Sequence, residues 1–176
     1  MNLQKILFKA FVTITYLLRC WVLILPIAVG IVILKEEGWK YGFTFIQSNS
    51  NVAFFVSFAL SFLIALYHTL SFEEAEGAPD QNYLKAHQEV RVRANFSMDS
   101  LENWMANHPK FCDIVRDENQ ITASKKVYFL KPDRVSIRLE NEIFIVQSKP
   151  YFKWWFIDFA RNYKTVKSIA KTIKNL

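Results

Sequence analysis

Residues 52–72, VAFFVSFALSFLIALYHTLSF, form a run of 21 residues without a formal charge. About 20 consecutive apolar residues are needed for a helix to cross the hydrocarbon core of a bilayer. The alternative, a buried helix of a water-soluble protein, requires a far larger protein around it. Acidic residues follow at once in the segment EEAEG. The run therefore predicts a transmembrane helix that ends near residue 72.

A second apolar segment, residues 10–34, precedes this run and is interrupted by Arg19 and Pro26. A cleaved signal peptide has an early basic region, a short apolar core and a small-residue cleavage site. This segment is longer than such a core, and it ends in LKEEGWK without a convincing site. It predicts a retained helix, so residues 1–76 are expected to form a membrane region with two spans.

Two features of these expected spans concern their packing and function. Arg19 is an ionisable residue inside a span, which is a functional hypothesis by default. The alternative is that its long stem carries the guanidinium back to the headgroups. Ser57, Ser61 and Ala65 recur at every fourth residue and share one helix face. Small residues at this spacing allow close helix contact, with the first helix of the same chain as the expected partner and another subunit as the alternative.

Lysine and arginine residues near the spans predict the orientation. Lys5 and Lys9 precede the first span, whereas Lys35 and Lys40 in the connecting loop lie beside two glutamates. A basic segment follows the second span. This bias predicts that both ends lie in the cytosol and that a short loop lies outside. The expected location is the inner (plasma) membrane of a bacterium, as a multi-pass protein.

The formal charge divides the chain at the end of the second span. Residues 77–176 carry 17 Lys and Arg against 11 Asp and Glu, whereas residues 1–76 carry 5 of each. The net charge of +6 therefore belongs to the C-terminal part, which begins with a linker containing Gly77 and Pro79. A basic surface of this kind can meet anionic lipid, nucleic acid or an acidic protein. Cys20 and Cys112 are expected in different environments, without a disulfide between them.

The C-terminal part, residues 77–176, shows strand and helix patterns in a recognisable order. Residues 97–109 predict a short helix, with Ser97 or Asp99 as the N-cap and Leu101, Trp104 and Met105 on one face. Alternating apolar and polar residues predict the strands, of which the last two form a hairpin. The expected strands cover residues 89–96, 111–115, 120–130, 133–140 and 142–151.

The last segment, residues 165–176, predicts an amphipathic helix. Val166, Ile169, Ile173 and Leu176 form its apolar stripe. The expected order is therefore β-α-β-β-β-β-α. This order predicts a small α+β domain, a mostly antiparallel sheet with two helices on one face, following two transmembrane helices.

The stretch SKPYFKWWFIDFARN, residues 148–162, interleaves aromatic and charged residues. In an extended segment, Phe152, Trp154 and Phe156 would lie on one side and the intervening residues on the other. One set would join the core, and the other would meet lipid headgroups, where Trp and Lys are favoured. A protein partner or single-stranded nucleic acid are the alternatives. The predicted contact residues are Tyr151, Lys153, Trp155, Arg161, Lys164, Lys167 and Lys171.

Residues 131–169 resemble the C-terminal part of a bacterial family known as domain of unknown function 1499. Members pair two strands and continue with an Asp-x-Gly-x-Asn turn that leads into the last helix. Asp133, Val135 and Arg138 match the first strand, and Ser148 ends the second. Asp158, Ala160 and Asn162 fall at the turn. Ala160 departs from the family pattern, which has glycine there, and this puts the tight turn in question.

This resemblance implies a fold and no known activity. The residues themselves give Ser148, Asp158 and Asn162 a structural role at the turn. Asp158 and Asn162 precede the final helix, where either side chain can accept hydrogen bonds from unpaired backbone N–H groups. A binding role for these residues is the alternative.

The sequence contains no convincing catalytic constellation. Its three histidines lie in three separate segments without metal-ligand spacing, and four glycines form no phosphate-binding loop. We therefore expect a non-enzymatic accessory or scaffold protein without a cofactor. Its expected partners are membrane lipids and a protein, or a second copy through the membrane helices. A membrane-tethered nucleic-acid sensor or defence component and an enzyme acting on a membrane substrate are the alternatives.

Overall fold

The computed structural model describes residues 3–35, 37–40, 43–74, 84–93, 97–128, 130–152 and 156–175. The chain divides into two compact units, residues 1–74 and 75–176. We call them the helical unit and the sheet unit. Leu176 of the predicted apolar stripe lies outside the described residues, as do Lys153, Trp154 and Trp155 of the aromatic stretch.

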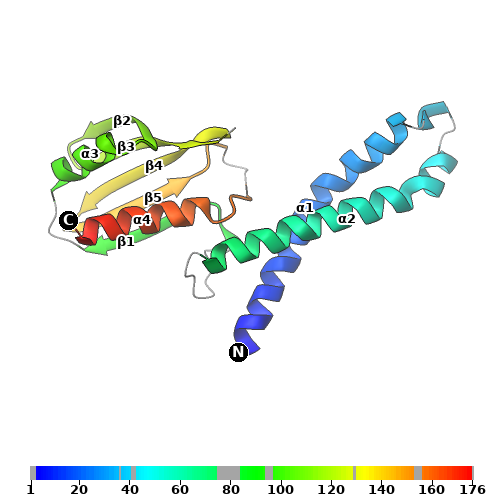
Figure 1. The fold of residues 1–176 in the computed structure, drawn as a ribbon, viewed down its shortest axis with the longest axis horizontal. Coiled ribbons are helices and arrows are strands. Elements are labelled where there is room, and N and C mark those ends of the chain that lie inside the picture. The colour runs from blue at the N-terminus through cyan, green and yellow to red at the C-terminus, as the bar shows by residue number, and fades with distance from the viewer. Residues whose placement is uncertain are drawn as a thin grey trace. The chain divides into compact units, whose positions relative to one another are not determined.

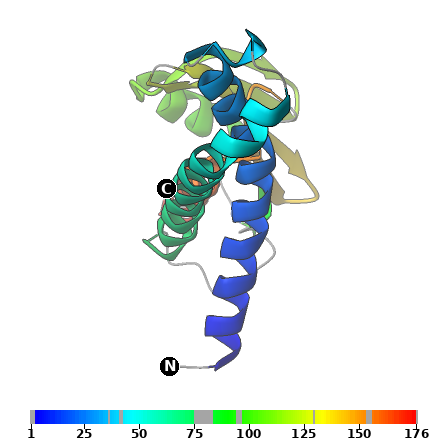
Figure 2. The same ribbon diagram turned by 90° about the vertical axis from the view of Figure 1, so that its right-hand side faces the viewer.

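The helical unit is a hairpin of two long helices, α1 (Leu3–Lys35) and α2 (Phe43–Glu74), with a short 3-10 turn, η1 (Gly38–Lys40), between them. Figures 1 and 2 both show α2 running back along α1. Leu3–Lys35 and the part Ser50–Phe72 of α2 are each long and apolar enough to cross a membrane. The two long apolar helices expected from the sequence are confirmed.

Small and polar residues form the seam between α1 and α2. Ser57, Ser61 and Ala65 are fully buried against α1. The Trp21 Nε1–H of α1 donates to the Ser57 hydroxyl at 3.0 Å. The predicted packing of this small-residue face on the first helix is confirmed. Cys20 is buried in this unit and Cys112 lies in the other, and both are free thiols.

The sheet unit is a five-stranded antiparallel sheet with the order β1-β5-β4-β3-β2. Its element order confirms the predicted β-α-β-β-β-β-α pattern. The elements are β1 (Gln88–Arg93), α3 (Met98–Asn107), β2 (Phe111–Asp117), β3 (Gln120–Val127), β4 (Leu130–Glu140), β5 (Ile143–Lys149) and α4 (Arg161–Asn175).

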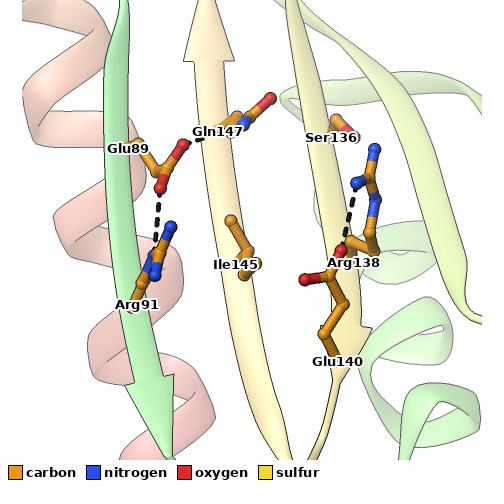
Figure 3. A pocket seen from close by; sticks show the side chains of 7 residues that line it. All are labelled: Glu89, Arg91, Ser136, Arg138, Glu140, Ile145 and Gln147. Atoms are coloured by element: carbon orange, nitrogen blue, oxygen red, sulfur yellow. Dashed lines mark hydrogen bonds and ion pairs between the residues drawn. The ribbon is translucent and has the colours of Figure 1, made fainter.

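Both helices of this unit cover the same face of the sheet. Leu101 and Met105 of α3 and Val166, Ile169 and Ile173 of α4 are buried in one cluster with the inward side chains of the strands. The Ser97 hydroxyl caps α3 by accepting the backbone N–H of Ser100. Figure 3 views the opposite face, with the helices behind the strands. Within the described residues of the sheet unit no helix covers that face, and we call it the open face.

After β5, the described residues 150–152 and 156–160 of the aromatic stretch form no strand. β5 ends at Lys149, and Pro150, which follows, has no backbone N–H for the ladder. Tyr151 and Phe152 are therefore not on opposite sides of an extended segment. Both are exposed, and their rings contact each other edge to face at 5.1 Å. The prediction that Phe152 turns into the core is wrong, and α4 begins at Arg161, four residues before the expected start.

The buried seam of the hairpin gives a test of its packing. Replacing Ala65, which is fully buried, with leucine adds volume where the two helices touch. We expect this substitution to destabilise the hairpin by about 1–3 kcal/mol. Ala59→Leu is the matched control, because Ala59 lies on the exposed side of the same helix. Thermal unfolding in mild detergent measures both variants, and an equal loss in the two would contradict the assigned seam.

Candidate functional site

The turn that leads into α4 places Asp158 beneath the helix start. Phe159 and Ala160 both have left-handed backbone conformations, with φ of 50° and 57°. This turn brings the Asp158 carboxylate back to the helix, where its Oδ2 accepts the backbone N–H of Asn162 at 3.0 Å. Asp158 therefore satisfies one of the N–H groups that a helix start leaves unpaired, as the sequence predicted.

The three predicted turn residues form one buried network. The Ser148 hydroxyl donates to the Asn162 Oδ1 at 2.5 Å, and the Asn162 side-chain amide donates to the Asp158 Oδ2 at 3.0 Å. None of the three is more than 1% exposed. The network joins the end of β5 to the beginning of α4. This geometry supports a structural role for all three residues.

An ion pair between a fully buried carboxylate and a partly exposed arginine joins α4 to β4. The Arg161 guanidinium donates to both carboxylate oxygens of Asp133, from Nε at 2.5 Å and from Nη2 at 2.8 Å. Asp133 lies near the start of β4 and is fully buried. Beside this pair, the Lys125 ammonium donates to the Thr165 hydroxyl at 2.6 Å. Arg161, predicted as a surface contact, is thus occupied by an internal carboxylate.

Burial sets the electrostatics of this cluster. It raises the pKa of Asp158 from 3.8 to about 6, although the hydrogen bonds from Asn162 oppose the change. Burial also raises the pKa of Asp133, against the effect of Arg161. The pKa of Lys125 is lowered by burial and by the neighbouring Lys110. Sequence reasoning missed Lys125 and Thr165 because their contact spans 40 residues of chain.

A second group of residues gathers at the same end of the sheet. Three cations, Lys131, Arg134 and Lys149, lie there with two exposed aromatic rings, Tyr151 and Phe152. The Lys131 ammonium lies 4.5 Å from the centre of the Tyr151 ring, and the Arg134 guanidinium lies 5.1 Å from it. Arg134 and Lys149 are direct cross-strand neighbours. We call these five residues the cationic end.

The other predicted contact residues lie on the outer side of α4. Lys164, Lys167 and Lys171 are all exposed, and Lys167 lies 5.4 Å from the Tyr163 ring. The opposite side of α4 packs on the sheet. Tyr151 lies after β5, beside Lys131 and Arg134, and the three lysines lie on α4. Lys153 and Trp155 of that prediction lie outside the described residues.

In the helical unit, Arg19 lies on the exposed side of α1 with its guanidinium 5.5 Å from the Tyr16 ring. The Tyr16 ring also stacks on His68 of α2, with ring centroids 3.8 Å apart. Both Tyr16 and His68 are fully buried. His68 therefore lies in the seam between the two helices.

Across the described ranges, no group of three His, Cys, Asp or Glu residues gathers as metal ligands would. No model of a known protein family matches the chain, and no curated protein matches it either. The resemblance to domain of unknown function 1499 stays a hypothesis. Three of the residues that carry it, Ser148, Asp158 and Asn162, form the buried network at α4.

The left-handed turn before α4 gives a test at Ala160. Valine is β-branched and fits this conformation poorly, and Ala160 is fully buried. We expect Ala160→Val to destabilise the sheet unit by more than about 2 kcal/mol. Ala160→Gly removes a buried methyl but relieves the backbone, so it should change stability by less than about 1 kcal/mol. Urea unfolding of the full chain compares them, and similar losses would contradict the turn geometry.

The raised pKa of Asp158 predicts a pH dependence of stability. Between pH 3.8 and about 6 the folded state binds more protons at this carboxyl than the unfolded state does. Its contribution to stability is therefore present at low pH and is lost as the pH rises through 6, by about 3 kcal/mol in total. An asparagine in its place cannot titrate, so the free energy of unfolding of the wild type minus that of Asp158→Asn should fall over this range.

Urea unfolding of the two proteins at a series of pH values measures this difference. Asp133 titrates in both proteins, so the difference reports Asp158 together with its electrostatic coupling to Asp133. Parallel pH profiles would show that Asp158 titrates as it does in the unfolded chain.

Proposed function

We propose that this chain is a two-span protein of a bacterial inner membrane, with both termini in the cytosol. It acts as a non-enzymatic accessory or scaffold protein, and its cationic end holds the sheet unit against the anionic lipid surface. The observation that carries this proposal is the cationic end itself. Three cations and two exposed aromatic rings gather there.

The exposed surface of the hairpin supports insertion into a bilayer. Small and polar residues lie in the seam together with Val12, Tyr16 and Phe72, whereas many other large apolar side chains point outward. Ile27, Phe55 and Leu63 are each more than 60% exposed. An apolar surface this large is rare on a soluble protein and suits contact with hydrocarbon. Lys5 and Lys9 in the first turns of α1 and the basic sheet unit after α2 support the cytosolic placement of both ends.

Chain connectivity supports the choice of surface. Residues 75–87 join the end of α2 to the start of β1. The first residue of β1, Gln88, pairs with Ser148, the neighbour of Lys149. The chain from the membrane therefore enters the sheet unit at its cationic end. Thirteen linking residues span at most about 45 Å, a length that allows this end to reach the bilayer.

The charge of the cationic end suits such a contact. A lysine or arginine near an anionic leaflet contributes about 1 kcal/mol, and aromatic rings favour the headgroup level. Three cations together contribute about 3 kcal/mol. That amount is weak for a free protein but sufficient for a tethered one, because the tether supplies a high local concentration. The exposed lysines of α4 leave a second basic surface for a protein partner.

Amide hydrogen exchange of the full chain in lipid nanodiscs tests the membrane contact. Exchange near the starts of β1 and β4 and the end of β5 should slow roughly tenfold when anionic lipid replaces zwitterionic lipid. Lys131→Glu with Lys149→Glu should abolish this slowing, because two attractive charges become repulsive.

Lys167→Glu with Lys171→Glu is the matched control, with the same charge change on the outer side of α4. It should retain the slowing. If both double variants lost the slowing equally, the effect would come from overall charge or from α4. If amide exchange in the wild type were the same on anionic and zwitterionic lipid, the membrane contact would be refuted.

A further inference from the structure

The open face of the sheet contains two hollows of different electrostatic character. Figure 3 shows one of them, where charged groups are paired with each other. Glu89 accepts hydrogen bonds from Arg91 at 3.2 Å and from Gln147 at 2.9 Å. Arg138 donates to Glu140 at 3.1 Å. This first hollow holds two cations and two acids and offers no excess charge to a ligand.

The second hollow lies over β2 to β5 and has a volume of about 440 Å³. Arg134, Arg138 and Lys149 line it, with Asp113 as its one acid. Its volume is within the range of small-molecule sites. It includes Arg134 and Lys149 of the cationic end and therefore joins that end to the open face.

The sheet register aligns a row of donors across this hollow. Ser124 of β3 is opposite Arg134 of β4, which is opposite Lys149 of β5. Like charges directly opposite each other on neighbouring strands repel. Among the described residues, no acidic side chain forms an ion pair with Arg134 or Lys149. An anion between these two side chains would remove the repulsion and gain charge-assisted hydrogen bonds.

Two hydroxyl groups stand beside this pair of cations. Ser136 lies two residues after Arg134 on the same face of β4, and its oxygen accepts a hydrogen bond from Gln120 at 3.3 Å. Its own O–H is then available to donate. The Ser124 hydroxyl has no hydrogen-bond partner within the described ranges. The hollow thus offers two cations for one negative charge and two hydroxyls for polar groups next to it.

We propose that this second hollow binds the headgroup of an anionic glycerophospholipid, with its phosphate between Arg134 and Lys149 and its hydroxyls against Ser124 and Ser136. This inference rests on the proposed membrane contact. A lipid is the source of the phosphate because the hollow shares Arg134 and Lys149 with the cationic end. Phosphatidylglycerol fits, since it carries one negative charge and two hydroxyls. In phosphatidylserine an ammonium and a carboxylate replace these two hydroxyls, so its headgroup lacks the hydroxyl partners proposed for Ser124 and Ser136.

Native mass spectrometry of the full chain in detergent, with equimolar phosphatidylglycerol and phosphatidylserine, tests this preference. The wild type should retain phosphatidylglycerol about tenfold more than phosphatidylserine. Ser124→Ala with Ser136→Ala should bring the ratio close to equal, because each lost hydrogen bond costs several-fold in affinity. Ser168→Ala, an exposed serine on α4, is the control and should leave the ratio unchanged. Unchanged thermal unfolding confirms that the variants fold.

The outcomes separate this inference from the proposed function. Equal retention of the two lipids by the wild type would overturn the headgroup preference, even if exchange still slowed on anionic nanodiscs. Amide exchange that is the same on anionic and zwitterionic nanodiscs would overturn both the headgroup preference and the proposed membrane contact. Glycerol 3-phosphate is the soluble probe. Its binding to the wild type and to variants that lack Arg134 or Lys149 is compared with the lipid result. If its binding depended on Arg134 and Lys149 while neither lipid was preferred, the occupant would be a soluble phosphate ester and the lipid assignment would be wrong.

Discussion

The ion pair between the buried Asp133 and the partly exposed Arg161 is the interaction on which the organisation of the sheet unit depends. It fixes the first residue of α4 to the start of β4 by two hydrogen bonds. A buried charge is tolerated only with its partner, and removing one member of such a pair costs about 3–5 kcal/mol. The Ser148 to Asn162 hydrogen bond adds a second link, from β5. These links set where α4 begins.

Fixing α4 in this way divides the basic residues into two classes. Arg161 and Lys125 are held inside by Asp133 and Thr165. The cations of the cationic end lie outside this network, at the end of the sheet where the chain from α2 enters. Their mutual repulsion is not relieved by acids among the described residues. An end of this kind is suited to anionic ligands.

In the helical unit, polar groups lie inside and apolar groups lie outside, which is the reverse of their arrangement in a soluble fold. Its seam contains hydroxyls, a histidine and small side chains, and its outer side is apolar. Ser57 and Ser61 satisfy their hydroxyls within α2 by donating to backbone carbonyls. Polar groups inside the seam and apolar groups outside suit a hydrocarbon surrounding, where the outer surface has no water to avoid.

Local patterns in the sequence determined the elements, because each is encoded within a short window. The apolar runs predicted α1 and α2, alternation predicted the strands, and the spacing of Ser57, Ser61 and Ala65 predicted the seam. The tertiary structure alone decided the partners of individual charges. Arg161 could not be distinguished from Lys164 by sequence, because Asp133 lies 28 residues earlier. The opposition of Arg134 and Lys149 depends on strand register, which the hairpin turn and sheet order fix only in the folded chain.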